Sequence, residues 1–302
     1  MTATQGISPM IWLDHEAEEA AKLYVSLFPN SRIIDMVRAA AETDDPPNPV
    51  PVGNVLTVDF EIGGQAFTAL NGGPYFKINP SISFFVNCDT ADEVDTLFAR
   101  LVEGGMALMP LDTYPFSERF GWVQDRFGVS WQIMLDKRPQ KIEIALLFTG
   151  PNAGKAEEAV RFYTSVFDGS RIDHVERYAD GEQGGASGSV KRAMFHLDGR
   201  AFSAMDSDFA HAFNFNEGVS FVISCASQAE IDAFWAVLSA DPASEQCGWC
   251  KDRFGVSWQV VPSELTDMMK NPDREKARRV TEAFMPMKKL DLAALRKAYN
   301  GE

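Results

Sequence analysis

Hydrophobic and polar positions near the N-terminus follow two different periods. Residues 7–13 form a short apolar run typical of a strand, and from Ala17 to Phe28 apolar residues recur at the spacing of an amphipathic helix. Alternation then resumes on both sides of the glycine pair 63–64, which is typical of a hairpin turn. The pattern predicts the order β-α-β-β-β, with a helix over 17–28 and strands over 7–13, 31–38, 55–61 and 65–70. The segment 40–53, rich in proline and acidic residues, is expected to be an exposed loop.

The same order of elements recurs along the rest of the chain. After Ser81, a helix around Val94 to Leu101 is closed by a glycine pair and accompanied by expected strands over 83–88, 107–112, 120–124 and 130–135. The second half predicts helices over 153–167 and 228–238, and strands over 141–148, 173–177, 189–196, 201–206, 219–225 and 257–261. Its linker into the last hairpin, 239–246, is shorter than the corresponding segment 102–119.

An internal repeat accounts for this recurrence. The eight residues from Asp125 to Gln132 return letter for letter from Asp252 to Gln259, and Glu18 to Phe28 resembles Glu157 to Phe167. The spacing is that of a whole small domain rather than a solenoid repeat. We therefore expect two homologous domains, 1–138 and 139–263, each with two β-α-β-β-β modules, followed by a helical tail, 264–302, that docks across both.

Composition and charge restrict the partners. The chain of 302 residues is 45% hydrophobic and carries a formal net charge of −15, which opposes binding to nucleic-acid phosphates. No apolar run reaches the length of a membrane span, and the first residues lack the pattern of a signal peptide. We expect a cytoplasmic protein whose partner is neither nucleic acid nor membrane.

Cysteine chemistry has one candidate motif. Cys247 and Cys250 have the C-x-x-C spacing of a redox dithiol or half a zinc site, but the first repeat lacks both residues. Residues three apart on a strand point to opposite faces, so the two sulfurs are not expected to meet. Cys88 and Cys225 occupy equivalent repeat positions, which favours buried packing.

Several strings carry a family resemblance: 69–74 (ALNGGP), 86–88 (VNC), 246–249 (QCGW), the repeated DRFGVSWQ, and 271–277 and 287–289 in the tail. With paired β-α-β-β-β modules, the chain resembles the PhnB-like branch of the vicinal oxygen chelate superfamily, whose proteins often carry the name 3-demethylubiquinone-9 3-methyltransferase. The superfamily includes glyoxalase I, extradiol dioxygenases and antibiotic-resistance proteins. The resemblance implies an α+β fold in which two modules form a cupped mixed sheet with helices outside. It also implies that the two domains replace a two-chain assembly, in a monomer or a homodimer.

The resemblance also implies where a metal would bind. Metal-using members of the superfamily place His or Glu ligands on the first and last strands of the modules. Here the first strands contain no His, and the last strands offer Asn71, Gln132, Asp206 and Gln259. A neutral amide is a poor ligand in a site without another anion. The histidines, His15, His174, His196 and His211, show no ligand spacing. We expect no metal and, because no strand-helix turn is glycine-rich, no S-adenosylmethionine.

The repeated octapeptide allows two interpretations. In the structural one, Asp125 and Gly128 form the turn, Phe127 and Trp131 pack the sheet against a helix, and Gln132 satisfies a neighbouring backbone group. In the functional one, alternate residues face the cup and bind a ligand. The ligand-binding candidates are Ser130, Gln132 and Met134, their counterparts Ser257 and Gln259, and the rim residues Asn71 and Asp206.

The function predicted first is metal-free binding of a small molecule in one or both cups, and whether the protein is an enzyme stays open. The alternative is a metal-dependent lyase or dioxygenase that uses Asp206, Glu61 or His196 as ligands. The methyltransferase named by the family is a third possibility. The rims, Asn71 in one repeat and Asp206 in the other, predict cups that differ in charge.

Overall fold

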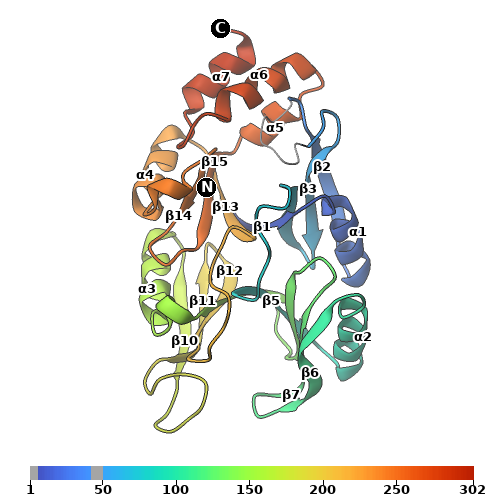
Figure 1. The fold of residues 1–302 in the computed structure, drawn as a ribbon, viewed down its shortest axis with the longest axis vertical. Helices are drawn as coiled ribbons and strands as arrows, with labels where there is room; N and C mark the ends of the chain where they lie inside the picture. Colours follow the sequence, from blue (N-terminus) through green and yellow to red (C-terminus); the bar gives the residue numbers. More distant parts are fainter. Residues whose placement is uncertain (1–5, 42–49) are drawn as a thin grey trace. The chain divides into compact units, whose positions relative to one another are not determined.

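The chain folds into two compact units. A computed structural model describes residues 6–41 and 50–302 (Figure 1), so most of the loop expected over 40–53 lies outside the described residues. Unit 1 comprises Met1–Ser26, Asn30–Lys77 and Asn216–Glu302, and unit 2 comprises Leu27–Pro29 and Ile78–Phe215.

Each unit contains one mixed sheet. Unit 1 has a seven-stranded sheet of order β14-β15-β13-β1-β4-β3-β2, built from β1 (Ile7–Leu13), β2 (Arg32–Arg38), β3 (Val55–Ile62), β4 (Gln65–Asn71), β13 (Val219–Cys225), β14 (Trp249–Lys251) and β15 (Ser257–Pro262). Unit 2 has an eight-stranded sheet of order β10-β11-β12-β9-β5-β8-β7-β6, built from β5 (Ile82–Cys88), β6 (Met106–Tyr114), β7 (Ser117–Gln124), β8 (Ser130–Leu135), β9 (Ile142–Phe148), β10 (Arg171–Arg177), β11 (Val190–Leu197) and β12 (Arg200–Asp206). The predicted strands are therefore confirmed, apart from shifts at their ends.

The modules pair across the two sequence repeats. Strand β1 runs antiparallel to β13, with Ile11 opposite Val219, and β5 runs antiparallel to β9, with Ile82 opposite Leu146. Each sheet therefore combines the first module of one repeat with the second module of the other, whereas the sequence predicted that two modules of one repeat share a cup. The boundaries 1–138 and 139–263 describe the duplication and not the compact units. Because homologous first strands present the same backbone groups, either pairing satisfies them.

Amphipathic helices cover one face of each sheet. In unit 1 these are α1 (Ala17–Leu27) and α4 (Gln228–Leu238), and in unit 2 they are α2 (Ala91–Leu101) and α3 (Ala156–Val166) (Figure 1). Helix α2 begins where the Thr90 hydroxyl accepts a hydrogen bond from the Glu93 amide, and α4 begins in the same way at Ser227. Helix α3 starts later than predicted because a 3₁₀ turn, Gly150–Asn152, comes first.

The last module of the chain is truncated. Where the first repeat has the long edge strand β6, the second has a 3₁₀ turn, Pro242–Ser244, and a β14 of three residues. The tail occupies the free edge: the amides of Cys247 and Gly248 donate to the carbonyls of Met287 and Lys288, at 2.7 Å each. The shorter linker predicted here thus reflects a missing strand.

The tail is helical, as predicted, with α5 (Leu265–Met269), α6 (Arg274–Phe284) and α7 (Leu292–Asn300). Its buried cluster consists of Leu265, Met268, Val280, Leu290 and Leu295. The tail contacts both repeats, since the Leu292 amide donates to Gln228 and Lys270 pairs with Asp35. Both contacts lie within unit 1.

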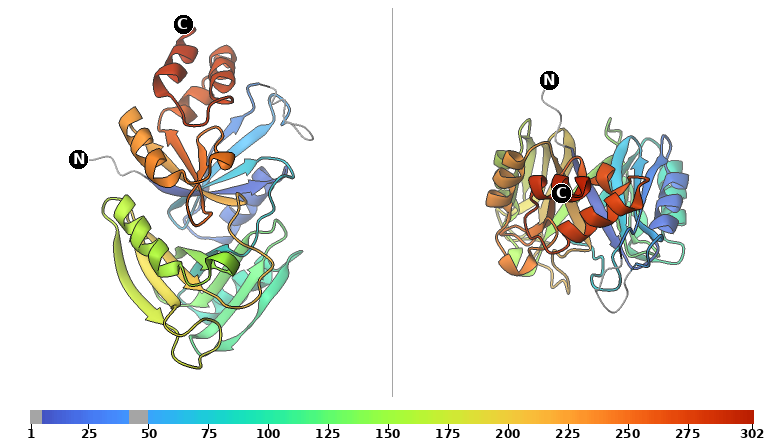
Figure 2. Two further views of the ribbon diagram at one scale, coloured as in Figure 1. Left: turned by 60° about the vertical axis from the view of Figure 1, so that its left-hand side comes forward. Right: turned by 90° about the horizontal axis from the view of Figure 1, so that it is seen from above.

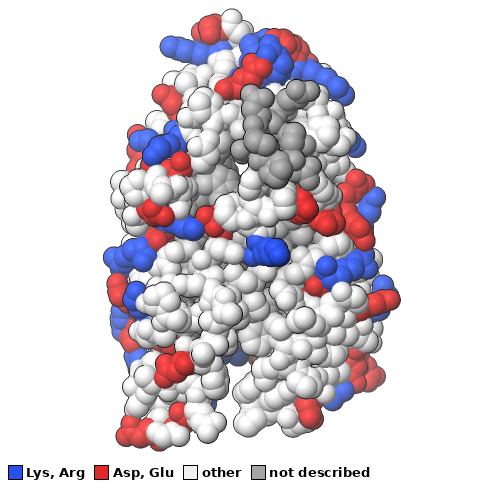
Figure 3. Space-filling model, in the orientation of Figure 1, with Lys and Arg blue, Asp and Glu red and all other residues white. Residues whose placement is uncertain are grey.

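On the face drawn in Figure 3, charged side chains of both signs lie mainly along the sides and at the top, and no continuous basic patch is visible there. Within residues 6–41 and 50–302, no helix is long and apolar enough to cross a membrane.

Candidate functional site

The face of each sheet opposite its helices is called the inner face. In unit 2, a Cβ added to Gly121 would meet the Phe98 ring of α2 at 2.4 Å, so Gly121 and its register partner Ile133 face the helix. Gln132 and Met134 therefore point to the inner face. There Met134 packs in a buried cluster with Phe85, Phe120 and Ala145, next to the partly buried Met109, Tyr114, Trp122 and Met205. At the lower end of Figure 3, the surface is notched between the part built from β6 and β7 and the part built from β10 and β11.

The two glutamines of the octapeptide make equivalent contacts. The Gln132 amide donates to the Ser83 hydroxyl at 2.7 Å, and the Gln259 amide donates to the Ser220 hydroxyl at 2.9 Å. Both serines lie on the first strand of the same module, so each bond joins its first and last strands on the inner face. Gln259 also contacts the Met10 sulfur at 2.9 Å. The structural interpretation predicted a backbone partner for Gln132, and the structure shows a side-chain partner instead.

An arginine crosses the inner face of unit 2. Arg192, on β11, donates to Glu143 on β9 at 3.0 Å, and its guanidinium lies 4.7 Å from the centre of the Phe85 ring on β5. Arg138 approaches the same carboxylate at 3.2 Å. The Glu143 side chain is only 3% exposed, and a carboxylate this buried needs such cationic partners. The pair fixes the Arg192 side chain over the cluster.

Three polar atoms on this face have no hydrogen-bond partner within the described chain: Asn87 Oδ1, Ser203 Oγ and Arg192 Nε. Asn87 and Ser203 are 2% and 0% exposed. The register places Asn87 beside Met134 and Ser203 beside Ala145, on the same side as Gln132. Buried polar groups without partners are costly, so such a set points to a water or ligand that completes it.

Asn71 and Asp206 lie on the helix side of their sheets. Asn71 Oδ1 accepts the Ala17 amide at 2.9 Å at the start of α1, and Asp206 Oδ1 accepts the Ala156 amide at 3.1 Å at the start of α3. Burial raises the pKa of Asp206, and its bonds from the amides of Val190, Ala156 and Gly154 act against that rise. The structure does not bring these predicted rim residues onto the inner face. Asn71 lies in unit 1 with Gln259, and Asp206 lies in unit 2 with Gln132, so neither residue shares a unit with the glutamine of its own repeat.

The two serines that open the last strands differ. Ser130 accepts a hydrogen bond from the Trp122 indole at 2.8 Å. Its counterpart Ser257 is buried, and its hydroxyl has no partner within the described residues. The counterpart of Trp122, Trp249, instead packs edge-on against Trp12, with 5.7 Å between the ring centres. The two inner faces are therefore not copies of each other.

The inner-face residues do not fit a divalent metal. The central positions of the first and last module strands carry Ser83, Gln132, Ala145 and Ser203 in unit 2, and Met10, Thr68, Ser220 and Gln259 in unit 1. Hydroxyl, amide and thioether groups at these positions supply no anion, and Glu143, a carboxylate on the inner face of unit 2, is already paired with Arg192 and Arg138. Within the part of the chain that the structure describes, no three His, Cys, Asp or Glu residues gather as a metal site.

The ligands of the alternative metal site are also dispersed. Glu61, in unit 1, pairs with Arg32 at 3.0 Å. His196, in unit 2, lies 2.6 Å from Asp173, and Asp206 holds the start of α3 from the other end of β12. Neither unit assembles them.

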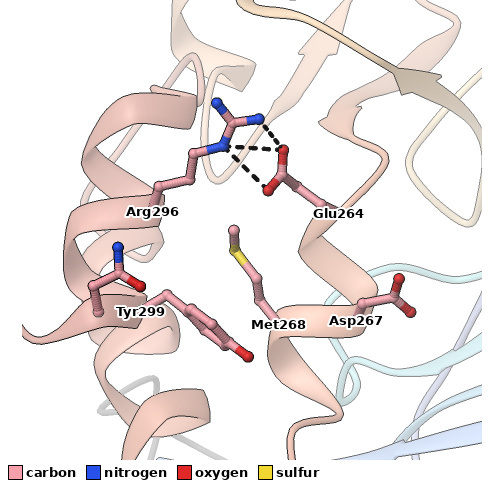
Figure 4. Close-up of a pocket in the computed structure, with 6 residues that line it drawn as sticks. Glu264, Asp267, Met268, Arg296 and Tyr299 are labelled. Carbon is pink, nitrogen blue, oxygen red and sulfur yellow. Dashed lines mark hydrogen bonds and ion pairs between the residues drawn. The ribbon is translucent and has the colours of Figure 1, made fainter.

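A separate pocket lies in the tail, between α5 and α7 (Figure 4), with a volume of about 350 Å³. It is lined by Glu264, Asp267, Met268, Arg296, Tyr299 and Asn300. Two of its charged groups, Arg296 and Glu264, pair with each other at 2.6 Å. No sequence pattern indicated this pocket.

Comparison with known proteins gives a family and a fold. A family model described as 3-demethylubiquinone-9 3-methyltransferase matches residues 5–134 and 140–261. The PhnB protein from Bacillus cereus is 38% identical, covering 43% of this chain and 99% of its own, with a TM-score of 0.39. Glyoxalase I from Zea mays is 11% identical, covering 88% of this chain and 95% of its own, with a TM-score of 0.51, a likeness that concerns the fold. Comparison with curated proteins gave no match.

Proposed function

We propose, from the premise that this chain belongs to the PhnB-like family described as 3-demethylubiquinone-9 3-methyltransferase, that it binds a small molecule on the inner face of unit 2 without a metal. The observation that carries the proposal is the set of three unpartnered polar atoms beside an apolar cluster on that face. An apolar wall with a few converging polar groups is typical of a small-molecule site.

The unpartnered polar atoms indicate which hydrogen-bonding groups the ligand carries. Arg192 Nε donates, Asn87 Oδ1 accepts, and the Ser203 hydroxyl can do either. A ligand that binds all three must carry an oxygen acceptor and a separate hydroxyl or amide donor, because the register puts Ser203 level with Ser83 and Asn87 four residues further along β5. Its apolar part lies against Met134 and Phe85. Because Glu143 already fixes Arg192, little side-chain entropy is lost on binding.

The role of Gln132 follows from its bond to Ser83. The pair joins β5 to β8 beneath the ligand and leaves the Gln132 carbonyl oxygen as a further acceptor. Gln259 and Ser220 repeat this pair in unit 1, where the surrounding side chains differ. We therefore assign the first site to unit 2.

The test is mass spectrometry of ligands that co-purify with the protein, repeated on Arg192→Met and Gln132→Ala. We expect Arg192→Met to lose the ligand and Gln132→Ala to retain less of it. Arg171→Met is the matched control, since Arg171 is exposed on β10 and pairs with Asp173. Unchanged ligand retention in Arg192→Met and Gln132→Ala would show that this face is not the site. Gln259→Ala distinguishes the units, because we expect it to leave retention unchanged.

Two competing functions have direct tests. A metal-dependent lyase or dioxygenase requires stoichiometric divalent metal, which elemental analysis of protein purified without chelator detects. The methyltransferase named by the family requires binding of S-adenosylmethionine, which calorimetry measures. We expect neither, because the inner-face carboxylates are already paired with cations, Glu143 with Arg192 and Asp59 with Lys270, and the strand-helix turns are not glycine-rich.

A further inference from the structure

We propose that the C-terminal tail is a strap that closes the inner face of unit 1, and that Lys270 is the latch on its releasable side. The strap is defined as residues 264–302. It reaches both edges of the seven-stranded sheet: its backbone pairs with the segment that leads into β14, and Lys270 reaches Asp35 on β2. Figures 1 and 2 show the tail at the end of unit 1, extending from the side of α4 to the side of β2 and β3.

The β14 side is firmly attached. Besides the two backbone bonds to Cys247 and Gly248, the Gln228 side chain donates to the Leu290 carbonyl at 3.1 Å and accepts the Leu292 amide at 2.8 Å. Leu290 itself is fully buried in the tail cluster. Apolar burial and backbone bonds open rarely.

The β2 side is held by the ion pair of Lys270 in addition to Leu265 and Met268 of α5, which are buried in the tail cluster. The Lys270 ammonium lies 2.8 Å from Asp35 and 3.6 Å from Asp59, and the three side chains are 23%, 47% and 28% exposed. The hydrogen bond from Lys270 lowers the pKa of Asp35, aided by the Met36 amide. Ion pairs this exposed are weak and are screened by salt. Helix α5, whose C-cap is Lys270, has only five residues and is too short to persist without its contacts.

The latch lies over β2 and β3, at the edge of the sheet, on a row of residues that leads to the centre of the inner face. The register runs from Asp35 to Asp59, from Asp59 to Thr68, and from Thr68 to Met10, so Lys270 sits on the row that leads to Met10. At the end of β15, Val261 packs against the tail cluster. Release of Lys270, together with Leu265 and Met268 of α5, is expected to open the way to Met10 and its neighbour Gln259 while the β14 side stays attached.

Hydrogen exchange followed by mass spectrometry tests the latch on the full chain. We expect amides 265–270 to exchange about two- to fivefold faster in Lys270→Met. We expect a larger acceleration in Lys270→Glu, where three like charges meet, and none in Lys270→Arg. In the wild type, raised salt accelerates the same amides. Salt has no such effect in Lys270→Met.

The matched control is Lys22→Met, which removes an exposed ion pair with Glu18 on α1 of the same unit. It leaves exchange of the tail unchanged. If amides 265–270 exchange equally fast in the wild type, in Lys270→Met and in Lys270→Glu, the latch is refuted. If the whole segment 265–300 is accelerated uniformly, the strap is not hinged at β14. Oxidation of Met10 by hydroxyl radicals rises with α5 opening if the strap covers the inner face. Constant Met10 oxidation in Lys270→Glu would refute that cover.

Discussion

The indole N–H of Trp131 donates a hydrogen bond of 2.8 Å to the buried carboxylate of Asp125. The other oxygen of that carboxylate accepts the amides of Phe127 and Val129, so one side chain closes the turn and anchors the following strand. Asp252 makes the same three bonds, to Trp258 at 2.8 Å and to the amides of Phe254 and Val256. The turn and the strand that follows it depend on several residues of the octapeptide at once, which explains why both copies keep the same sequence.

Replacing Asp125 by Asn should lower the free energy of unfolding by about 2 kcal/mol, because the amide group opposes the indole donor and the charge-assisted bonds are lost. Urea unfolding measures this, and Asp252→Asn should cost a similar amount. The exposed Asp168→Asn serves as the control. A loss below about 0.5 kcal/mol in both buried variants would contradict the proposed role of the carboxylate.

Gly72→Ala should lower stability by about 2 kcal/mol, because the added Cβ would lie 2.2 Å from the Trp12 ring. That ring cannot yield easily, since its N–H donates to the Gly73 carbonyl at 2.8 Å and its edge meets Phe76. Urea unfolding and near-ultraviolet circular dichroism report the change. Gly6→Ala, where a Cβ would meet nothing within 4 Å, should be neutral. Equal stability of the two variants would show that the Trp12 ring moves freely.

Only one of the four cysteines should react rapidly with a thiol reagent at pH 8. Burial raises the pKa of Cys88, Cys225 and Cys250 to about 12, so these thiols stay protonated. Cys247 is partly exposed, lies at a turn with φ of 52°, and directs its sulfur to the Met285 carbonyl at 3.1 Å. Colorimetric thiol titration should show one fast phase, absent in Cys247→Ser. Two fast thiols would revive the redox interpretation of C-x-x-C.

Stability should depend on pH through Glu157. Hydrogen bonds from Arg177 and Arg161 lower its pKa to about 2, from an ordinary value near 4.5. A carboxyl whose pKa is lower in the folded state stabilises the fold above its unfolded pKa, and this contribution is lost as pH falls from about 4.5 towards 2. After solvent screening it amounts to less than about 1 kcal/mol. Unfolding of wild type and Glu157→Gln should differ most above pH 4.5 and converge in acid. A constant difference would contradict this linkage.

The local structure was readable from the sequence because it depends on neighbours along the chain. A short apolar run predicted β1, in which Ile7, Pro9, Ile11 and Leu13 are buried while the residues between them are partly exposed. Helical spacing marked α1, whose Ala17, Ala20, Ala21 and Tyr24 face the core. The pairing of modules was not readable. The edges of β1 and β5 offer the same backbone groups to any homologous strand, so no local pattern selects the partner.

The candidate site was predicted in part. Gln132 and Met134 lie on the inner face as period-two alternation required, and the glutamine has a polar partner there. Arg192 and Glu143 were missed because a charge pair between β11 and β9 depends on sheet order. A signal existed in Glu143 itself, an acid inside the apolar strand Ile142–Phe148. Asn71 and Asp206 were wrongly expected at a rim. The sequence did not indicate that their side chains accept the first amides of α1 and α3.

The cross-repeat pairing sets an order of events during synthesis on the ribosome. Unit 2 can close once Phe215 has emerged, since its chain is then nearly continuous from Ile78. Strand β1 is made first, yet its partner β13 begins only at Val219. The edge of β1 that pairs with β13 therefore stays unpaired while the whole of unit 2 is translated. During that interval, a neighbouring nascent chain can supply the missing strand, so crowded polysomes should yield strand-exchanged dimers.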